Sequence, residues 1–329
     1  MVWGGSMRKP MVIPVTGKRS IVTIGFCPCW DMTYCINGLE WGDHKQVSKP
    51  TLVPAGKALN VSKALAWMGN QSAAAGLWGQ DDYSEAQKEW VKWTEYVKPS
   101  FTTVPGRTRR NLTLIDSLNY REIHLREHSE LSSRQALQDL RSDLRKIVNK
   151  DSLCVFAGLF PDEEFLSQAL SIIQDCQRRN GRIVMDTSGA PMEEALTRGN
   201  VWLIKPNVEE LGELVGENIP NRADKLSQAG RLLLNRVEMI LISRGEKGAI
   251  LLSQDATLRA QCVSRARQVI STVGCGDYLL AGFLKGMIRN RNLETALKTA
   301  IQAATAKAWG WTESISWPLA ASKIKVNIR

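Results

Sequence analysis

Short apolar runs alternate with amphipathic segments along most of the chain, and this pattern indicates the fold class. Five runs rich in β-branched residues, each bounded by turn residues, are typical of buried strands. They lie at residues 20–26, 153–159, 182–186, 201–207 and 239–245. The second, third and fourth precede segments with apolar positions three and four residues apart, as in an amphipathic helix. The alternation predicts an α/β fold with a mostly parallel central sheet flanked by crossover helices.

Two regions lack the helical segments. Residues 32–52 and 101–128 read as alternating strands without a crossover helix. We predict that they form one small, discontinuous β-sheet, here called the lid. Residues 18–31, 53–100 and 129–329 are then the α/β body. A ligand is expected at the carboxyl ends of the body strands, below the lid.

Composition limits the classes of protein that fit. The chain has 329 residues and is 43% apolar, enough to bury a full core. No apolar run reaches the roughly 18 residues of a membrane helix, and the N-terminal segment is a poor signal peptide. The seven cysteines have no paired spacing, which argues against a disulfide scaffold. We expect a cytoplasmic protein with no membrane partner.

The net charge of +10 points to anionic partners. A basic surplus suits nucleic acid, anionic lipid or small anionic substrates. The chain has no dense basic tract with interleaved aromatic residues, and no zinc finger or RNP-type segment. We therefore expect no nucleic-acid partner, and the dispersed charge fits a pocket that handles phosphate.

One segment carries the strongest chemical signal, residues 271–286, which read STVGCGDYLLAGFLKG. Gly274 and Gly276 let the backbone expose N–H groups ahead of a helix, and the helix dipole favours phosphate charge there. Asp277, in the first helical turn, is placed to take a proton from a hydroxyl nucleophile. The alternative is an ordinary helix start, an aspartate cap after a glycine turn.

Two further segments suit a polyhydroxylated, anionic substrate. Gly56 and Lys57 precede a helix whose first turn carries Asn60, so amide and ammonium groups lie together. Arg107, Arg109 and Arg110 surround a turn in the lid, and arginine suits bidentate phosphate binding.

A fourth segment suits phosphates and a metal ion. Lys205 and Asn207 follow a predicted strand, and Glu210 lies on the same helical face as Asn207. An asparagine and a glutamate at this spacing can organise a hydrated Mg²⁺ ion beside phosphates. The alternative is a capped helix with an exposed glutamate.

Taken in order, these segments resemble the PfkB (ribokinase-like) carbohydrate kinases, and within them the 1-phosphofructokinase and tagatose-6-phosphate kinase group. The resemblance runs from about residue 21 to about residue 312. Its motifs are IGFCPCWD, AGKALNVSKALAWMG, GLWGQDD, GRTRRNLTL, IKPNVEEL, SRGEKGAILL and STVGCGDYLLAGFLKG. It implies a ribokinase-like fold with a small β-sheet lid.

The resemblance also implies roles for individual residues. Asp277 is the catalytic base, and the amides of Gly274, Cys275 and Gly276 form the anion hole. The sugar phosphate is held by Asp31, Gly56, Lys57, Asn60, Arg107 and Arg109. The nucleotide is bound by Lys205, Asn207, Ser243, Gly245, Gly248 and Thr272. Magnesium is arranged by Asn207 and Glu210.

The implied activity is ATP-dependent, Mg²⁺-dependent phosphorylation of a ketohexose phosphate, with fructose 1-phosphate converted to fructose 1,6-bisphosphate. Tagatose 6-phosphate, fructose 6-phosphate or a nucleoside are alternative acceptors, and a non-catalytic sugar-phosphate sensor is the distant alternative. Departures from the family pattern at Ala58, Arg244 and Tyr278 motivate the sensor. The lid is also expected to serve as a homodimer interface, through Leu112 and Leu114 or their alternates.

Overall fold

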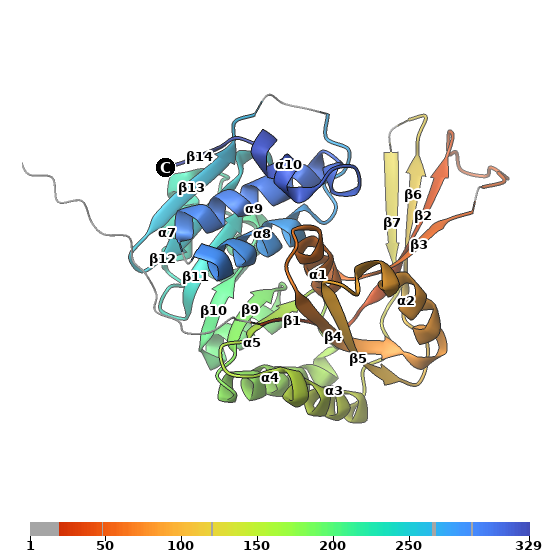
Figure 1. Cartoon of the computed structure of the whole chain (residues 1–329), viewed down its shortest axis with the longest axis horizontal. Coiled ribbons are helices and arrows are strands. Elements are labelled where there is room, and N and C mark those ends of the chain that lie inside the picture. The colour runs from red at the N-terminus through yellow and green to blue at the C-terminus, as the bar shows by residue number, and fades with distance from the viewer. Residues whose placement is uncertain (1–19, 48, 120, 265–267, 291) are drawn as a thin grey trace, which may run out of the picture.

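The computed structural model describes residues 20–47, 49–119, 121–264, 268–290 and 292–329. Residues 18 and 19, which we assigned to the body, lie outside these ranges. A ten-stranded sheet runs through the body, and a separate four-stranded sheet projects from it (Figure 1). In spatial order the strands of the large sheet are β14 (Val326–Ile328), β13 (Thr257–Cys262), β12 (Ala249–Ser253), β11 (Val237–Ser243), β10 (Val201–Ile204), β9 (Arg182–Asp186), β8 (Leu153–Ala157), β1 (Ile21–Gly25), β4 (Ser72–Gly79) and β5 (Val97–Val104).

The seven strands from β11 to β5 are all parallel, so the predicted α/β fold is confirmed. These strands have helices on both faces, which is why the central ones read as continuous apolar runs. β12, β13 and β14 continue the sheet in antiparallel order. Short turns join β11 to β12 and β12 to β13 as hairpins, whereas α8, α9 and α10 lie between β13 and β14 along the chain.

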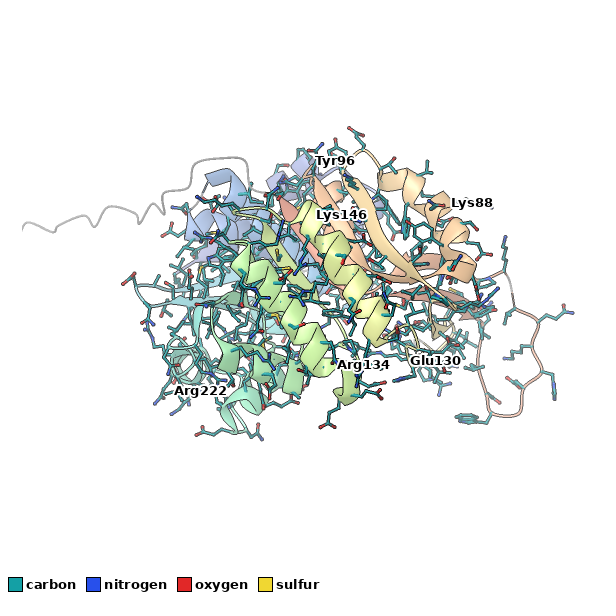
Figure 2. All side chains as sticks on the ribbon, turned by 90° about the horizontal axis from the view of Figure 1, so that it is seen from below. Lys88, Tyr96, Glu130, Arg134, Lys146 and Arg222 are labelled. Atoms are coloured by element: carbon teal, nitrogen blue, oxygen red, sulfur yellow. The ribbon has the colours of Figure 1, made fainter. Side chains whose placement is uncertain are left out.

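Two helical layers cover the large sheet, one on each face. The first layer contains α3 (Arg134–Ile147), α4 (Glu163–Arg178), α5 (Ala190–Arg198), α6 (Val208–Val215) and α7 (Ala223–Arg231). The second contains α1 (Lys57–Trp67), α8 (Cys275–Asn290) and α9 (Leu293–Ala308). Figure 2 shows α3 and α4 side by side, with Arg134 and Lys146 of α3 on the outer surface. Each layer therefore has its own apolar core against the sheet.

Two smaller helices complete the body. α2 (Tyr83–Trp90) packs its Trp90 ring against Trp78 of β4, with ring centroids 5.1 Å apart. α10 (Trp317–Lys323) lies against α9. None of the helices in the described ranges is long and apolar enough to cross a bilayer.

The small sheet has the order β3 (Thr51–Ala55), β2 (Cys29–Ile36), β6 (Arg110–Asp116) and β7 (Arg121–Arg126). Its strands come from both predicted lid regions, but the boundaries differ. β2 already begins at Cys29, and residues 101–104 belong to β5 of the large sheet. The alternating pattern of β5 continues into the lid, so the pattern does not mark where the chain changes sheet.

Candidate active site

A cavity of about 810 Å³ lies where the carboxyl ends of the parallel strands meet the base of the lid. Residues at or just after the ends of five strands line it, namely Gly25, Ala157, Thr187, Lys205 and Ser243. The lid contributes Asp31, Asn111 and Arg126. In open α/β sheets ligands bind outside the carboxyl ends of the strands, so this cavity is the candidate active site.

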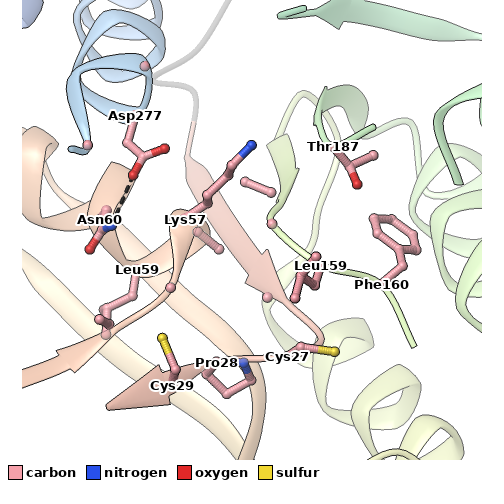
Figure 3. Close-up of a pocket in the computed structure, with 18 of the residues that line it drawn as sticks. Cys27, Pro28, Cys29, Lys57, Leu59, Asn60, Leu159, Phe160, Thr187 and Asp277 are labelled. Atoms are coloured by element: carbon pink, nitrogen blue, oxygen red, sulfur yellow. Dashed lines mark hydrogen bonds between the residues drawn. The ribbon is translucent and has the colours of Figure 1, made fainter. Parts of the chain in front are cut away.

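Asp277, in the first turn of α8, lines this cavity and is 5% exposed. Its carboxylate accepts a hydrogen bond from Asn60 Nδ2 at 2.9 Å (Figure 3). Burial, and then the negative charge of Asp186, raise the pKa of Asp277 to about 7. A carboxyl group with this pKa is poised to accept a proton from a substrate hydroxyl near neutral pH.

Tyr278 does not separate Asp277 from the cavity. Its ring packs against Trp67, with ring centroids 6.0 Å apart, and lies within 5.7 Å of the Lys307 ammonium. Tyr278 lines a neighbouring cavity and is absent from the lining of the main one. This departure from the family pattern therefore leaves the carboxylate accessible.

The glycine turn before α8 has the backbone that an anion site needs. Gly274 has φ +78°, and Gly274 and Gly276 both line the cavity. A Cβ at Gly276 would lie 3.3 Å from Lys205 Nζ, so a glycine here lets the ammonium approach the turn. The first N–H groups of an α-helix have no partner within the helix, and here they begin beside the cavity.

Cys275, in the same turn, is arranged differently from the anion-hole role that the resemblance implies for its N–H group. Its side chain does not line the cavity, and its N–H donates to the Thr272 carbonyl oxygen at 3.2 Å. Burial raises the pKa of the Cys275 thiol to about 11, because the thiolate would lose solvation. The thiol is therefore protonated at neutral pH and is not activated by the helix start.

Asp186, at the end of β9, joins the two lysines of the site. Its Oδ1 lies 3.3 Å from Lys57 Nζ and 3.2 Å from Lys205 Nζ. Burial by itself would raise the pKa of Asp186, but the two ammonium groups hold it below the usual range. Asp186 in turn raises the pKa of Lys57. The two cations are thereby held charged beside the glycine turn.

Asn207 and Glu210, the predicted magnesium pair, line the cavity and also cap α6. Asn207 Oδ1 accepts from the Glu210 N–H, and Glu210 Oε2 accepts from the Asn207 N–H, both at 2.8 Å. This reciprocal arrangement is a capping box. The capped helix considered as the alternative is thus present, and it leaves the second carboxylate oxygen of Glu210 for another partner.

The oxygen atoms near α6 suit a Mg²⁺ ion that keeps most of its waters better than a metal ion bound entirely by protein side chains. The described residues contain no cluster of three or more His, Cys, Asp or Glu side chains that could hold a metal. Mg²⁺ is commonly bound by one or two carboxylates, together with waters and substrate phosphates. Glu210 offers one free oxygen, and the buried Oδ2 atom of Asp186 has no hydrogen-bond partner among the described residues. These two atoms fit an ion carried mainly by phosphates.

Arg109 and Arg107, the predicted phosphate ligands of the lid, are not brought together. Arg109 lines the cavity, but its guanidinium donates to the carbonyl oxygens of Cys27, Pro28 and Glu127 and to Asn111 Oδ1. Four of its N–H groups are therefore occupied. Arg107 is exposed and is absent from the lining of the cavity.

Asp31 lies at the base of the lid, where Asn111 positions it. Asn111 Nδ2 donates to Asp31 Oδ1 at 3.0 Å, and both side chains line the cavity. Gly56, with φ +116°, ends β3 and starts α1, so the chain passes directly from the lid to Lys57. Ala58 also lines the cavity, and its Cβ would lie 3.2 Å from a Cβ at Gly25. The glycine in β1 therefore leaves the space that the Ala58 methyl group fills.

The predicted nucleotide residues separate into two groups. Lys205, Asn207 and Ser243 line the cavity, whereas Gly245, Gly248 and Thr272 do not. Gly248 has φ +82°, and a Cβ there would lie 2.0 Å from the Ala260 carbonyl oxygen, so it shapes the turn between β11 and β12.

Arg244, another departure from the family pattern, binds Asn221. Its Nε donates to Asn221 Oδ1 at 3.0 Å, and it is absent from the lining of the cavity. Sequence reasoning missed several residues of the cavity, among them Asp186, which holds its two lysines, and Asn111 and Arg126 of the lid. Asp186 is the last residue of a buried strand that lies between two other strands of the site, and this position was the only feature of the sequence that could have predicted it.

Comparison with solved structures identifies proteins that have the same fold. Phosphofructokinase-2 from Escherichia coli, solved with fructose 6-phosphate, superposes with a TM-score of 0.83 at 20% sequence identity, covering 95% of this chain and 98% of that one. A possible 1-phosphofructokinase from Thermotoga maritima gives a TM-score of 0.78 at 18% identity, covering 94% of this chain and 100% of that one. These similarities support the ribokinase-like architecture of an α/β body with a lid.

The sequence comparisons define the family. The profile of the pfkB family carbohydrate kinases matches residues 18–308, so the chain belongs to this family. It is a phosphotransferase that acts on a sugar hydroxyl, and carbohydrate kinases of this family use ATP as the co-substrate.

Two relatives with different named activities are similar to this chain over most of its length. A 1-phosphofructokinase from Vibrio cholerae is 29% identical over 293 residues, which cover 86% of this chain and 87% of the relative. A tagatose-6-phosphate kinase from Staphylococcus epidermidis is 26% identical over 284 residues, covering 85% and 89%. The predicted family is confirmed.

Proposed function

We propose that the protein transfers the γ-phosphate of ATP to a ketohexose phosphate, converting fructose 1-phosphate to fructose 1,6-bisphosphate. The observation that carries the proposal is Asp277, buried but open to the cavity, directly behind the Gly274–Gly276 turn. The relatives named 1-phosphofructokinase and tagatose-6-phosphate kinase support a phosphorylated acceptor.

In the proposed mechanism Asp277 takes the proton of the acceptor hydroxyl. The hydroxyl oxygen then forms a bond to the γ-phosphorus, and the bond to the β,γ-bridging oxygen breaks to release ADP. Asn60 holds the Asp277 carboxylate in place. Lys57, Lys205 and the N–H groups of Gly274 and Gly276 neutralise charge on the transferred group, so catalysis consists of positioning and electrostatic stabilisation.

Magnesium completes the proposed site. When bound, Mg²⁺ neutralises charge on the β- and γ-phosphates of the nucleotide. Glu210 and, through water, Asn207 and Asp186 are the side chains that would hold it. Ser243, at the end of β11, would face the nucleotide from the next strand.

A panel of acceptors tests the proposed substrate. Purified protein is incubated with ATP, Mg²⁺ and fructose 1-phosphate, tagatose 6-phosphate, fructose 6-phosphate or a nucleoside, and ADP release is measured. We expect fructose 1-phosphate to give the highest kcat/KM. A higher value for another acceptor would replace the substrate and leave the reaction unchanged. Binding of sugar phosphate without ADP release from any acceptor would support a sensor.

Most of the departures that favour a non-catalytic sensor lie away from the cavity. Two of the three departures behind it, Arg244 and Tyr278, lie outside the lining of the cavity. Asp277 and the Asn207–Glu210 pair remain within it. We therefore propose an enzyme.

The lid is also proposed as a homodimer interface. Leu112 and Leu114 pair across strands with Leu125 and Ile123, on the lid face opposite Asn111. Leu125 is 53% exposed and Ile123 41% exposed, so this face is available to a second copy. A related Escherichia coli phosphofructokinase-2 has been solved in a tetrameric form. A monomeric mass in solution would remove this proposal.

We place the reaction in the cytoplasm. All seven cysteines are free, as is usual in a reducing compartment where ATP and sugar phosphates occur.

A further inference from the structure

A second cavity, here called the side cavity, adjoins the catalytic cavity at the glycine turn before α8. It has a volume of about 540 Å³ and is bounded by α1, the segment 92–96, α8 and the end of α9. Five residues line both cavities: Asp31, Ala55, Asn60, Val273 and Gly274. The turn proposed to receive the transferred phosphoryl group therefore lies at the boundary between the two cavities.

Lys307, near the end of α9, reaches this turn from the side cavity. Its Cε lies 3.5 Å from where a Cβ at Gly274 would be, much as Lys205 Nζ lies 3.3 Å from where a Cβ at Gly276 would be. Lys205 lines the catalytic cavity, whereas Lys307 lines only the side cavity. One lysine from each cavity therefore approaches the turn that carries the N–H groups of the anion site.

The charge of Lys307 is held by an aromatic ring and not by a carboxylate. Its ammonium lies 5.7 Å from the centroid of the Tyr278 ring, within the range of a cation–π interaction. In the part of the chain that the structure describes, it forms no ion pair. Its field reaches the turn: burial raises the pKa of the Cys275 thiol, and the Lys307 charge acts against this rise.

Two other lysines line the side cavity, but their ammonium groups bind elsewhere. Lys63 Nζ donates to the carbonyl oxygen of Pro54. Lys92 Nζ forms an ion pair with Glu89 at 2.6 Å. The carboxylates in the lining are Asp31, Glu95 and Glu313. Lys307 is thus the lysine of the side cavity that lies against the glycine turn.

Tyr278 is fixed on its other side by aromatic neighbours. Its ring packs against Trp67, with ring centroids 6.0 Å apart, and Trp67 packs edge-on against Trp317, with centroids 5.3 Å apart. A ring held in this way gives the Lys307 ammonium one preferred position beside the turn. The departure from the family pattern at Tyr278 is therefore linked in space to Lys307.

We propose that Lys307, held by Tyr278, stabilises the negative charge of the transferred phosphoryl group from behind the Gly274–Gly276 turn and thereby raises kcat. A fixed cation near the group in transfer lowers the barrier without reorganisation of solvent. Lys307 does not line the catalytic cavity, so it acts across the backbone of the turn and touches neither substrate. This inference rests on the proposed function, because it takes the turn to be the place where the phosphoryl group is transferred.

The test compares Lys307→Ala and Lys307→Arg with a matched control, Lys298→Ala. Lys298 is an exposed lysine on the same helix and lines neither cavity. For each variant, kcat and the KM values for ATP and fructose 1-phosphate are measured at pH 8, and urea unfolding reports stability. The assays are repeated with ethylammonium chloride, which supplies a small ammonium group to the space left by the deleted side chain. Tetraethylammonium chloride at the same ionic strength is the control salt.

We expect Lys307→Ala to lower kcat about 10-fold, less than the loss of a donor that touches the reacting group, because the charge acts across the backbone. Both KM values should stay within about twofold of the wild type, since Lys307 contacts neither substrate. Ethylammonium should restore kcat of Lys307→Ala at least about threefold, and tetraethylammonium should not, because only the small cation fits beside the turn. Lys307→Arg should keep more activity than Lys307→Ala, and Lys298→Ala should behave as the wild type.

The outcomes separate this inference from the proposed function. If the wild type phosphorylates a sugar phosphate and Lys307→Ala has the same kcat, only the assignment of Lys307 is overturned. An equal loss of kcat in Lys307→Arg, with no gain from ethylammonium in Lys307→Ala, also overturns it, since lost packing would then be the cause. If the wild type releases no ADP with any acceptor, the proposed function fails and this inference fails with it.

Discussion

The body wall and the lid wall of the cavity are built differently. On the body wall, Asp277 and Asp186 are almost fully buried, and Asp186 forms ion pairs with Lys57 and Lys205. On the lid wall, Asp31 and Asn111 are half-buried and Arg126 is exposed. Buried charges in a paired network resist change, whereas exposed side chains on a lid can be exchanged at little cost in stability. This difference underlies the proposal that the body carries the reaction and the lid carries the choice of substrate.

Asp186→Asn should produce the largest loss of stability. The substitution keeps the shape of the side chain but leaves the buried Lys205 ammonium without its counter-charge. Breaking a buried ion pair in this way typically costs about 3–5 kcal/mol, to be measured here by urea unfolding. Asp224→Asn is the control, because Asp224 is an exposed carboxylate paired with Arg222. An equal loss of stability in both variants would show that burial on the body wall is not the cause.

Asp277→Asn should raise stability while it removes activity. Because the pKa of Asp277 is raised from 3.8 to about 7 in the folded chain, the folded state holds a proton that the unfolded state releases. Asp277 therefore makes folding less favourable as pH rises from about 4 to about 7, by up to about 4 kcal/mol. The neutral amide removes this penalty. The unfolding free energy of the variant should exceed that of the wild type at pH 8, with a smaller difference at pH 5. Equal values at both pH values would contradict the burial of a charged carboxylate.

Much of this architecture is readable in the sequence. The apolar runs and the helical spacing predict the parallel sheet, and the glycine turn predicts where Asp277 lies. Asp186 is not predicted, because a single aspartate after a strand gains its meaning only when Lys57 and Lys205 approach it from other elements. The hydrogen bonds that Arg109 makes within the protein are not predicted either. Its partners are mostly backbone carbonyl oxygens, which leave no trace in the pattern of side chains.

On the lid wall, Arg109→Ala should destabilise the protein moderately. It leaves the buried carbonyl oxygens of Cys27 and Pro28 without their donor, at a cost of about 1–3 kcal/mol. A lower midpoint of urea unfolding is the expected measurement. If instead the variant kept full stability and lost only affinity for sugar phosphate, Arg109 would be a ligand after all.

Arg107→Ala should have the smallest effect. Arg107 is exposed and outside the cavity, so stability and KM should both match the wild type. A large rise in KM would show that the lid closes over the substrate and brings Arg107 into the site.

The pH dependence of kcat/KM is the most direct test of the central claim, that Asp277 is a buried carboxylate acting as the base. Only the ionised carboxylate can accept the proton of the acceptor hydroxyl, so kcat/KM should be low in acid and rise with pH. With the pKa of Asp277 in the free protein at about 7, kcat/KM should increase tenfold per pH unit well below pH 7 and level off above it. A kcat/KM that stays constant between pH 5 and pH 8 in the stably folded protein would contradict the account.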